Sequence, residues 1–302
     1  MKKVLFATTA LVASAGIASA QGVTLSGSAE MGIIGGDFAP FGETQFWTDI
    51  DVKFTLSGET DNGLTFGATI DLDEEGGFGG TNGGPESVFI SGAFGTLTMG
   101  DTDGAFDWAL TDLDQIADIN DSNTTHAGFN GNAGLDGTYD GQVARYDYSF
   151  GDFAFAVSAE IDDTGVGDPV FGIGGKWSGD LGGVNLGVGL GYQSDSATDL
   201  IGVSVDASFA GGFRGIVNYT DYSGAGLLES HVGLGVFYTM DALSVGANWG
   251  QYDFGVAGDM SGYGLAVNYD LGGGAVVQAG YGASDIFGFN LDGFSLGIAM
   301  SF

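Results

Sequence analysis

Seven aspartates within about twenty residues are the densest group of chemically active side chains in this sequence. They are Asp101, Asp103, Asp107, Asp112, Asp114, Asp118 and Asp121. Carboxylates at this spacing attract cations, and close pairs could hold Ca²⁺, which takes six to eight oxygen ligands. The stretch "DTDGAFD", with Asp101, Asp103 and Asp107, is a candidate calcium site, but no acidic cluster completes an EF-hand pattern. Solvated charge without a bound metal is the alternative.

Catalytic chemistry has little support in the remaining residues. The two histidines are His126 and His231, and no serine lies in a recognisable nucleophile setting. The chain has no cysteine, which removes thiol catalysis, disulfides and cysteine-based metal sites. An enzyme would need a nucleophile next to a base. We therefore expect no enzyme and interpret both histidines as polar loop or lumen residues.

The charge balance is strongly acidic, with 39 Asp and Glu against 6 Lys and Arg. Phosphate binding needs a footprint of basic side chains, so nucleic acid is excluded as a partner. Such a charge suits surroundings rich in salt or metal ions, which screen carboxylates from one another. At 44% hydrophobic residues, the chain is nevertheless too apolar to be disordered.

The first twenty residues have the pattern of a secretory signal peptide. Lys2 and Lys3 precede an apolar run, and Ala18-Ser19-Ala20 forms a small-x-small cleavage site. We expect cleavage of residues 1–20 and a single mature domain over residues 21–302. No later stretch approaches the roughly twenty apolar residues of a transmembrane helix.

Most of the mature chain alternates apolar and polar residues with a period of two. Segments such as "VTLSGSAEMGI", "LTFGATIDLD" and "VNLGVGLGY" are separated by Gly, Asp and Asn turns, and roughly sixteen of them can be counted. Each is close to the 9–11 residues with which a tilted strand crosses a bilayer. A soluble antiparallel sandwich also alternates. However, short and long connections alternate here, which favours a closed antiparallel transmembrane β-barrel.

The end of the chain fits such a closed ring. In "GFSLGIAMSF" every second residue is apolar, up to the terminal Phe302. In a closed barrel the last strand pairs with the first, and an outward Phe302 would lie in the aromatic girdle at the membrane interface. This ending also resembles the C-terminal assembly signal of bacterial outer-membrane proteins.

Strand parity sorts the charged residues to the inside. Lys53, Arg145, Lys176 and Arg214 all fall on the polar, inward face of their segments, as do Asp49 and Asp51. A Lys or Arg facing lipid at the midplane would cost roughly 2–4 kcal/mol, so this sorting is expected of a membrane barrel.

Residues 101–141 break the alternation. The first half of this segment has helix-like spacing at Phe106, Leu110, Leu113 and Ile116. A long third loop folded into the lumen would pack these residues on the wall and narrow the channel. An exposed outer loop is the alternative.

Several of these motifs together resemble the general porins of Gram-negative outer membranes, closest to the trimeric sixteen-stranded type of alpha-proteobacteria. The resemblance is carried by "VTLSGSAEMGI", "VKFTLSGETDNGLTFGATIDLD", "NYDLGGGAVVQAGYG", Phe302 and above all "SGAFGTLTMGD" before the long loop. It implies a homotrimer in outer-membrane lipid, with "DEEGGFGGTNGGP" latching a neighbour. It also implies a constriction in which loop carboxylates face wall arginines. This sequence departs from that pattern, because Asp49 and Asp51 occupy second-strand positions where arginines are common.

We therefore expect an outer-membrane porin for passive diffusion of small hydrophilic solutes and ions, with a preference for cations. Its constriction would comprise the seven loop aspartates with Asp49, Asp51, Lys53, Arg145, Lys176 and Arg214, with no cofactor except possible Ca²⁺. The alternative is a secreted, acidic, glycine-rich β-solenoid adhesin that binds Ca²⁺, although the fixed short repeat of such proteins is absent.

Overall fold

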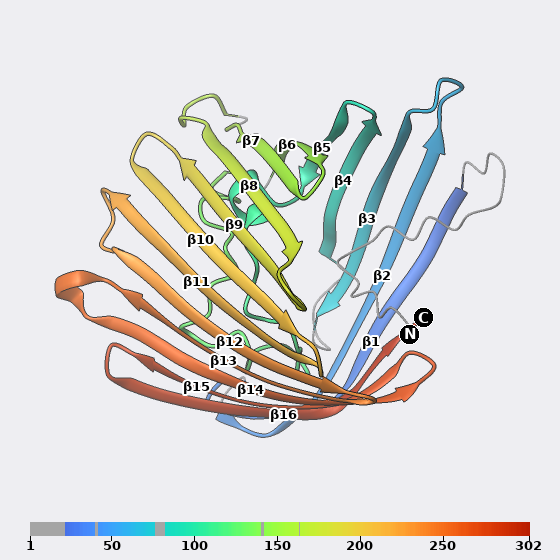
Figure 1. Cartoon of the computed structure of the whole chain (residues 1–302). Coiled ribbons are helices and arrows are strands. Elements are labelled where there is room, and N and C mark those ends of the chain that lie inside the picture. Colours follow the sequence, from blue (N-terminus) through green and yellow to red (C-terminus); the bar gives the residue numbers. More distant parts are fainter. Residues whose placement is uncertain (1–21, 40–41, 76–81, 140–141, 163) are drawn as a thin grey trace.

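The computed structural model describes residues 22–39, 42–75, 82–139, 142–162 and 164–302. Within these residues the chain forms sixteen strands that surround a lumen (Figure 1). The predicted signal peptide lies outside the described residues, as do residues 76–81 of the predicted latching segment, which spans residues 73–85. The strands are β1 (Gly22–Gly36), β2 (Gln45–Glu59), β3 (Thr65–Glu75), β4 (Asn82–Gly92), β5 (Gly95–Asp101), β6 (Gln142–Phe150), β7 (Phe153–Glu160), β8 (Val170–Asp180), β9 (Val184–Ser194), β10 (Thr198–Phe209), β11 (Phe213–Gly224), β12 (Ser230–Met240), β13 (Leu243–Asp253), β14 (Asp259–Gly272), β15 (Ala275–Ile286) and β16 (Phe289–Ser301).

The barrel closes through the two ends of the sheet. Every strand is antiparallel to its sequence neighbour, and β1 pairs with β16 in the register Ser28↔Ser301. The N–H of Phe302 donates to the carbonyl of Gly27 at 2.8 Å, so the last residue still belongs to the ladder. The predicted closed barrel is confirmed, and the solenoid alternative is wrong because its coils would not close one antiparallel sheet into a ring.

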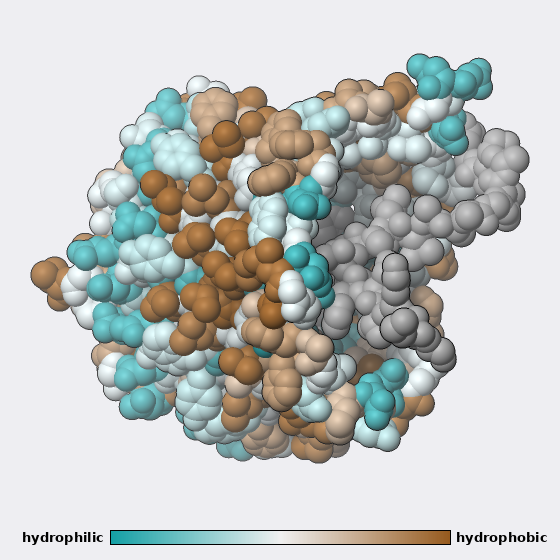
Figure 2. Space-filling view, in the orientation of Figure 1, coloured by the Kyte–Doolittle hydropathy of each residue, from teal (hydrophilic) through white to brown (hydrophobic). Residues whose placement is uncertain are grey.

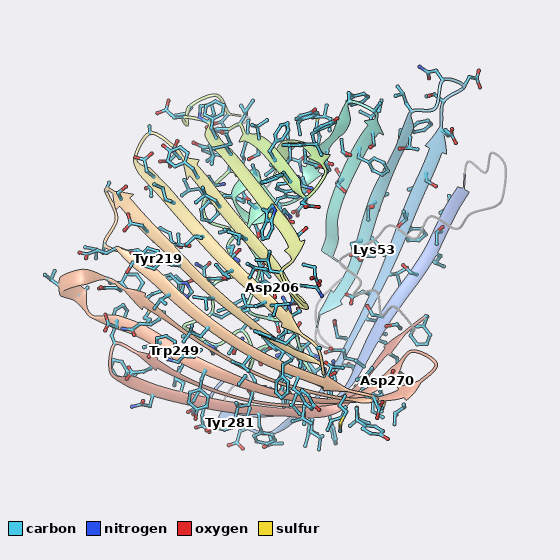
Figure 3. The ribbon with its side chains drawn as sticks, in the orientation of Figure 1. Lys53, Asp206, Tyr219, Trp249, Asp270 and Tyr281 are labelled. Atoms are coloured by element: carbon cyan, nitrogen blue, oxygen red, sulfur yellow. The ribbon has the colours of Figure 1, made fainter. Side chains whose placement is uncertain are left out.

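Side chains alternate between the outer face and the lumen, as the period of two predicts. On β16, Phe294 and Leu296 are exposed on the outside, while Ser295 between them is buried inside. Hydrophobic side chains gather over the outer face of the strands (Figure 2). Tyr219, Trp249 and Tyr281 lie on β11, β13 and β15, and Lys53 and Asp206 on β2 and β10 (Figure 3).

The connections differ between the two ends of the barrel. The end that carries Phe302 has tight turns, such as residues 151–152 and 241–242. The opposite end carries the long connections, including the third loop between β5 and β6. Two helical elements have defined bounds in the described residues, α1 (Ala105–Ala109) and the 3-10 turn η2 (Gly255–Ala257). Neither has the length and apolarity with which a helix crosses a membrane.

Candidate pore constriction

The third loop lies inside the barrel against the wall from β7 to β16 (Figure 1). Its outbound leg, residues 102–119, begins where the N–H of Ala105 donates to Ser158 Oγ of β7 at 2.8 Å. After a bend at residues 120–123, its return leg, residues 124–139, comes back to β7, where the N–H of Tyr139 donates to Glu160 at 2.9 Å. The predicted inward fold is confirmed, and the exposed outer loop is wrong.

The two legs contact the wall at different heights. The outbound leg meets the middle of the strands, where the N–H of Thr111 donates to Ser204 Oγ of β10 at 3.0 Å. The return leg meets strand ends nearer the long connections. There Tyr252, one residue before the end of β13, donates to the carbonyl of Phe129 at 3.0 Å. The loop is therefore a flat hairpin that narrows one side of the lumen.

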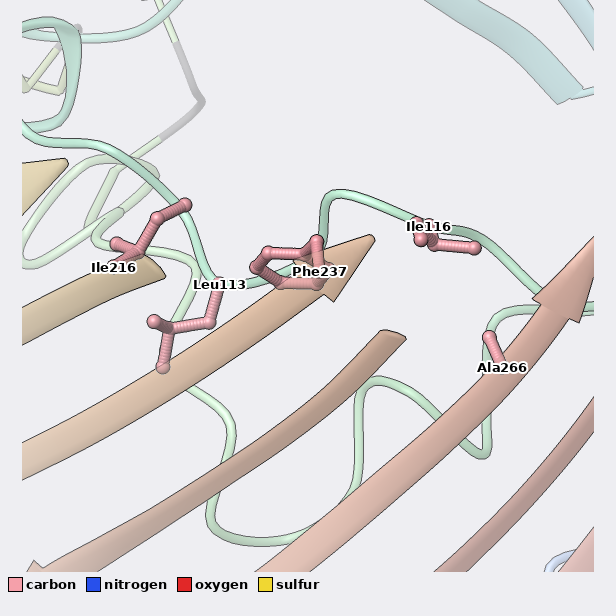
Figure 4. Packing of buried hydrophobic residues seen from close by; sticks show 5 residues of the cluster. All are labelled: Leu113, Ile116, Ile216, Phe237 and Ala266. Carbon is pink, nitrogen blue, oxygen red and sulfur yellow. The ribbon is translucent and has the colours of Figure 1, made fainter. Parts of the chain in front are cut away.

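The apolar residues of the outbound leg reach the wall as predicted, but mostly without a helix. Only residues 105–109 are helical, and the chain then continues in an irregular, extended form. Leu113 packs with Ile216 and Phe237, and Ile116 belongs to the same cluster (Figure 4). Three extended residues span roughly 10 Å, which matches the width of two neighbouring strands. The three-residue spacing of the apolar side chains therefore reflects the spacing of the wall strands that the loop crosses, and not a helical turn.

Glycines of the wall allow this close contact. A Cβ added at Gly189 would lie 2.0 Å from the carbonyl oxygen of Ala109, and one at Gly174 would lie 2.1 Å from that of Ala105. Any larger side chain at these positions would push α1 into the lumen.

The buried carboxylate of Asp118 fixes the bend. It accepts hydrogen bonds from Asn123 Nδ2 at 2.7 Å, from the N–H and hydroxyl of Thr124 at 3.1 and 2.9 Å, and from Ser295 of β16 at 2.5 Å. The Asp118 side chain is 0% exposed, so it holds the loop to the wall and does not face the lumen. This differs from its predicted place among the constriction residues.

A second set of contacts ties the two legs together. Asp136 of the return leg accepts from the N–H of Gly104 at 2.7 Å and from Gln193 of β9 at 2.6 Å. The Asn132 side chain donates to Asp112, which joins the legs halfway along. These contacts make the hairpin one unit.

Of the remaining predicted loop aspartates, Asp101 differs from its predicted place, because it is the last residue of β5 and falls on the same outward face as Leu97 and Met99. Asp101, Asp103 and Asp121 are exposed, whereas Asp107, Asp112 and Asp114 are half-buried. Burial is the main cause that raises the pKa of Asp107 to about 8, and the charges of Asp103 and Asp112 raise it further. At Asp121, partial desolvation at the bend and then the nearby charges of Asp114, Asp118 and Glu30 raise the pKa to about 7. Burial likewise raises the pKa of Asp112 and Asp136 to about 6 and that of Asp114 above its ordinary value.

The positive charges of the wall are largely matched by wall carboxylates. Lys53 Nζ lies 2.9 Å from Asp71 on the next strand. Arg145 Nε lies 3.6 Å from Asp147 on its own strand, and the Arg145 guanidinium also donates to the carbonyl of Asp103.

The other two cations contact the third loop. Arg214 pairs with Asp206 and donates to Gln115 of the outbound leg. The ammonium of Lys176 lies 3.9 Å from the ring centroid of Trp108, as a cation–π contact. All four predicted wall cations thus face the interior with a partner from the wall or the loop.

The bend faces a further acidic region on β1 and β2. A cavity of about 310 Å³ there is lined by Glu30, Asp49, Asp51, Trp47 and Asp121, among others. Ser28 donates to Asp51 at 2.9 Å, and Glu30 accepts from the N–H of Asn120 at 3.0 Å. Predicted residues from the second strand and from the loop therefore meet at one place.

The predicted calcium site is not formed by the described residues. Among them, no three His, Cys, Asp or Glu side chains converge in an arrangement that could hold a metal ion. Asp103 instead lies 4.0 Å from Arg145 Nη1, while Asp107 is half-buried beside the wall. The assignment of Asp101, Asp103 and Asp107 as metal ligands is not retained.

The loop anchors were missed in the sequence analysis. Glu160, Gln193, Asn218 and Asn268 each bond the main chain of the third loop. Their signal was available, because amide and carboxyl side chains recur at inward positions of strands that the loop crosses. Strand parity alone could not say which of them face water and which hold a loop.

Comparison with known proteins gives a consistent result. A family model described as Gram-negative porin matches residues 7–286. A porin of Rhodobacter capsulatus is 32% identical over 307 residues, which cover 87% of this chain and 95% of that relative.

Solved structures agree with this match. A porin structure refined at 1.8 Å resolution aligns with a TM-score of 0.74 and 25% identity, over 93% of this chain and 100% of the other. A triple mutant of Rhodopseudomonas blastica porin aligns with a TM-score of 0.72 and 22% identity over the same shares. The latter likeness shows the shared fold alone.

Proposed function

The chain belongs to the Gram-negative porin family of the outer membrane, and from this we propose that it forms a water-filled channel with a preference for cations. Small hydrophilic solutes and ions would cross it by passive diffusion. We further propose that residues 1–20 direct export, and that residues 21–302 form one barrel whose constriction lies at residues 101–141.

The observation that carries the cation preference is the unequal pairing of charges. Lys53, Arg145 and Arg214 each lie within 4.0 Å of a wall carboxylate, so their positive charges are offset before they reach the lumen. The aspartates of the third loop outnumber the cations that remain to pair with them. Asp103, for example, has a side chain 65% exposed, at the weaker distance of 4.0 Å from Arg145.

The physical consequence follows from the low dielectric of the barrel wall. Charges that line a narrow aqueous path between apolar walls concentrate their field along that path. A rim with net negative charge lowers the energy of a cation in the constriction and raises that of an anion. The positive charges of Arg145 and Lys176 weaken this negative field near the start of the loop but do not change its sign.

We also propose a homotrimer, supported by an uneven distribution of interfacial aromatic residues. Tyr and Trp are expected where a barrel meets the membrane interface. The sequence contains no Tyr before Tyr139 and no Tyr or Trp after Tyr281, and Trp47 points to the lumen, where it donates to Glu30 at 3.2 Å. The sector formed by β16 and β1 to β5 is thus suited to face another copy of the chain in place of lipid.

Single-channel conductance with ions of different size tests the proposed selectivity. Replacing chloride by a bulky organic anion should leave most of the conductance of purified protein, whereas replacing potassium by a bulky organic cation should remove most of it. The reverse pattern would overturn the cation preference. A trimer band in SDS without boiling would support the assembly, and a monomer after mild detergent extraction would contradict it.

A further inference from the structure

Both histidines of the chain bond the main chain of the same residue of the third loop, Gly128. The N–H of Gly128 donates to His126 Nδ1 at 3.1 Å, and the carbonyl of Gly128 lies 2.9 Å from His231 Nε2 on β12. The sequence contains no other histidine. One imidazole comes from the return leg and the other from the wall, so together they hold the leg against the barrel.

The peptide of Gly128 lies directly on the wall at this point. A Cβ added at Gly250 of β13 would be 2.0 Å from the Gly128 carbonyl oxygen, and one at Gly262 of β14 would be 2.5 Å from His126 Nδ1. His126 is 3% exposed and His231 0%. The two rings therefore act in a site closed to bulk water.

The hydrogen bonds define which nitrogen carries the proton in each ring. Because a backbone N–H can only donate, Nδ1 of His126 must be unprotonated and its proton lies on Nε2. Because a carbonyl can only accept, Nε2 of His231 must carry the proton. A second proton on His126 would occupy Nδ1 and remove the bond from Gly128. A second proton on His231 would fall on Nδ1, which is buried and has no hydrogen-bond partner among the described residues.

We propose that His126 and His231 are positioning residues that clamp the return leg of the constriction loop to the wall only while both imidazoles are neutral, so that acid releases this leg. The proposal rests on the channel proposed above, because it concerns the loop that shapes the channel.

Among the described residues, no carboxylate bonds either imidazole to stabilise a protonated clamp. The ring of His231 packs against that of Tyr252 of β13 at a centroid distance of 4.4 Å and a tilt of 48°, and Ser284 of β15, a neutral group, accepts from the N–H of Ala127. The Asn248 amide of β13 also lies beside His126, and its effect on the His126 pKa opposes that of burial.

Carboxylates near the clamp are engaged elsewhere. Asp118 bonds Thr124, two residues before His126, but it also accepts from Asn123 and Ser295. Asp253, next to Tyr252, accepts from the N–H of Gly255 at 2.7 Å. An added Cβ at Gly255 would lie 2.2 Å from Glu229 Oε1, which places the Glu229 carboxylate at the same turn. In the described part of the chain, the clamp thus has no carboxylate bonded to it as a counter-ion.

The direction of the pH effect follows from burial. Burial lowers the pKa of His126 to about 4, against 6.5 for a free imidazole. The attached leg is therefore favoured fully above pH 6.5, and this stabilisation is lost as pH falls towards 4. At pH 5 these two values weaken attachment by about 30-fold relative to neutral pH. The aspartates with raised pKa values have the opposite sign, because they favour the attached loop in acid.

A variant that keeps the hydrogen bonds of the clamp but cannot take up a proton separates the effect of the histidines on loop attachment from that of the aspartates. In His126→Asn the side-chain oxygen can replace Nδ1 as acceptor, and in His231→Gln the amide nitrogen can replace Nε2 as donor. Hydrogen–deuterium exchange of full-length protein in detergent should be followed by mass spectrometry at pH 7.5 and pH 5. The peptides to compare are residues 124–135 and, as the internal control, residues 105–119.

We expect equal exchange of residues 124–135 in the two proteins at pH 7.5, and at least tenfold faster exchange in the wild type at pH 5. Equal exchange at pH 5 would overturn the proposal. If the double variant does not fold, His126→Asn alone is compared in the same way with the same two outcomes. Conductance of the wild type is measured in parallel at pH 7.5. Absence of conductance would overturn the proposed channel function, whereas the exchange result would still decide whether the histidines clamp the loop.

Discussion

Arg214 donates to both carboxylate oxygens of Asp206 on the neighbouring strand, from Nε at 2.9 Å and from Nη2 at 2.7 Å. The same guanidinium reaches Gln115 of the third loop. The cation therefore holds the loop while its charge is balanced within the wall. Lys53 is likewise balanced by a carboxylate of the neighbouring strand, Asp71. With the wall charges paired in this way, the carboxylates of the loop determine the electric field in the lumen.

Asp206→Asn tests this balance directly. The substitution keeps the shape of the side chain but leaves the charge of Arg214 unopposed at the edge of the lumen. One unit charge about 6 Å from a permeating ion in water changes its energy by about 0.7 kcal/mol, with opposite signs for a cation and an anion, so the preference for cations over anions should fall about tenfold. Permeability ratios from bilayer recordings measure this change. Asp199→Asn, which removes a carboxylate bonded to the outward Tyr192, is the matched control and should leave the ratio unchanged.

Selectivity should also depend on pH across the neutral range. The pKa of Asp107 is about 8, that of Asp121 about 7, and those of Asp112 and Asp136 about 6. Each group is negative only above its own pKa, so the cation preference should weaken steadily as pH falls from about 8 to about 5. Permeability ratios of the wild type and of Asp107→Asn measure this. In Asp107→Asn the cation preference should no longer change near pH 8, where Asp107 titrates. A cation preference of the wild type that does not vary with pH would contradict the prediction.

The bend of the loop should depend on Asp118. Asp118→Ala leaves the donors of Asn123, Thr124 and Ser295 without their acceptor in a buried place, at a cost of about 1–3 kcal/mol for each unsatisfied group. Hydrogen exchange of residues 117–125 should accelerate accordingly, while the strands stay protected. Asp121→Asn removes the charge of an exposed carboxylate from the same bend, keeps a residue type that tolerates the positive φ of 48° there, and serves as control. Equal exchange in both variants would show that Asp118 does not hold the bend.

Closure of the barrel should depend on its last residue. Deleting Phe302 removes the main-chain hydrogen bonds with Gly27 and an outward aromatic side chain that is 79% exposed. We expect a lower yield of folded, heat-modifiable protein in the outer membrane, judged by gel mobility before and after boiling. Phe302→Tyr keeps both the bonds and an interfacial ring, and should assemble like the wild type. A normal yield of the deletion variant would remove Phe302 from the assembly signal.

Much of this fold was predictable because a barrel wall exposes each residue to one of two solvents. Alternation in "FSLGIAMSF" separates lipid-facing Phe294 and Leu296 from inward Ser295, and the structure confirms this sorting. The inward direction of Arg145 and Arg214 follows from the same parity, and their contacts with Asp103 and Gln115 agree with it. The face on which a side chain lies, towards lipid or towards the lumen, is set by its position within one strand, so a single sequence is enough to predict it.

The interior of the channel was less predictable because it depends on contacts between distant segments. The spacing of Phe106, Leu113 and Ile116 indicates that one side of the loop is apolar, but a helix and an extended chain across a sheet both satisfy it. Asp118 looks like its exposed neighbours in the sequence, but its hydrogen bond to the wall comes from Ser295, 177 residues later. The bond between His231 and Gly128 likewise spans 103 residues. No local pattern records such pairs.

The reversal potential of purified channels under a tenfold potassium chloride gradient shows directly which sign of charge governs the constriction. Net negative charge at the constriction predicts a potential of the cation-selective sign at pH 8, where most of the loop aspartates are charged. A potential of the anion-selective sign at that pH would contradict the account, because Lys53, Arg145, Lys176 and Arg214 would then dominate the field in the lumen.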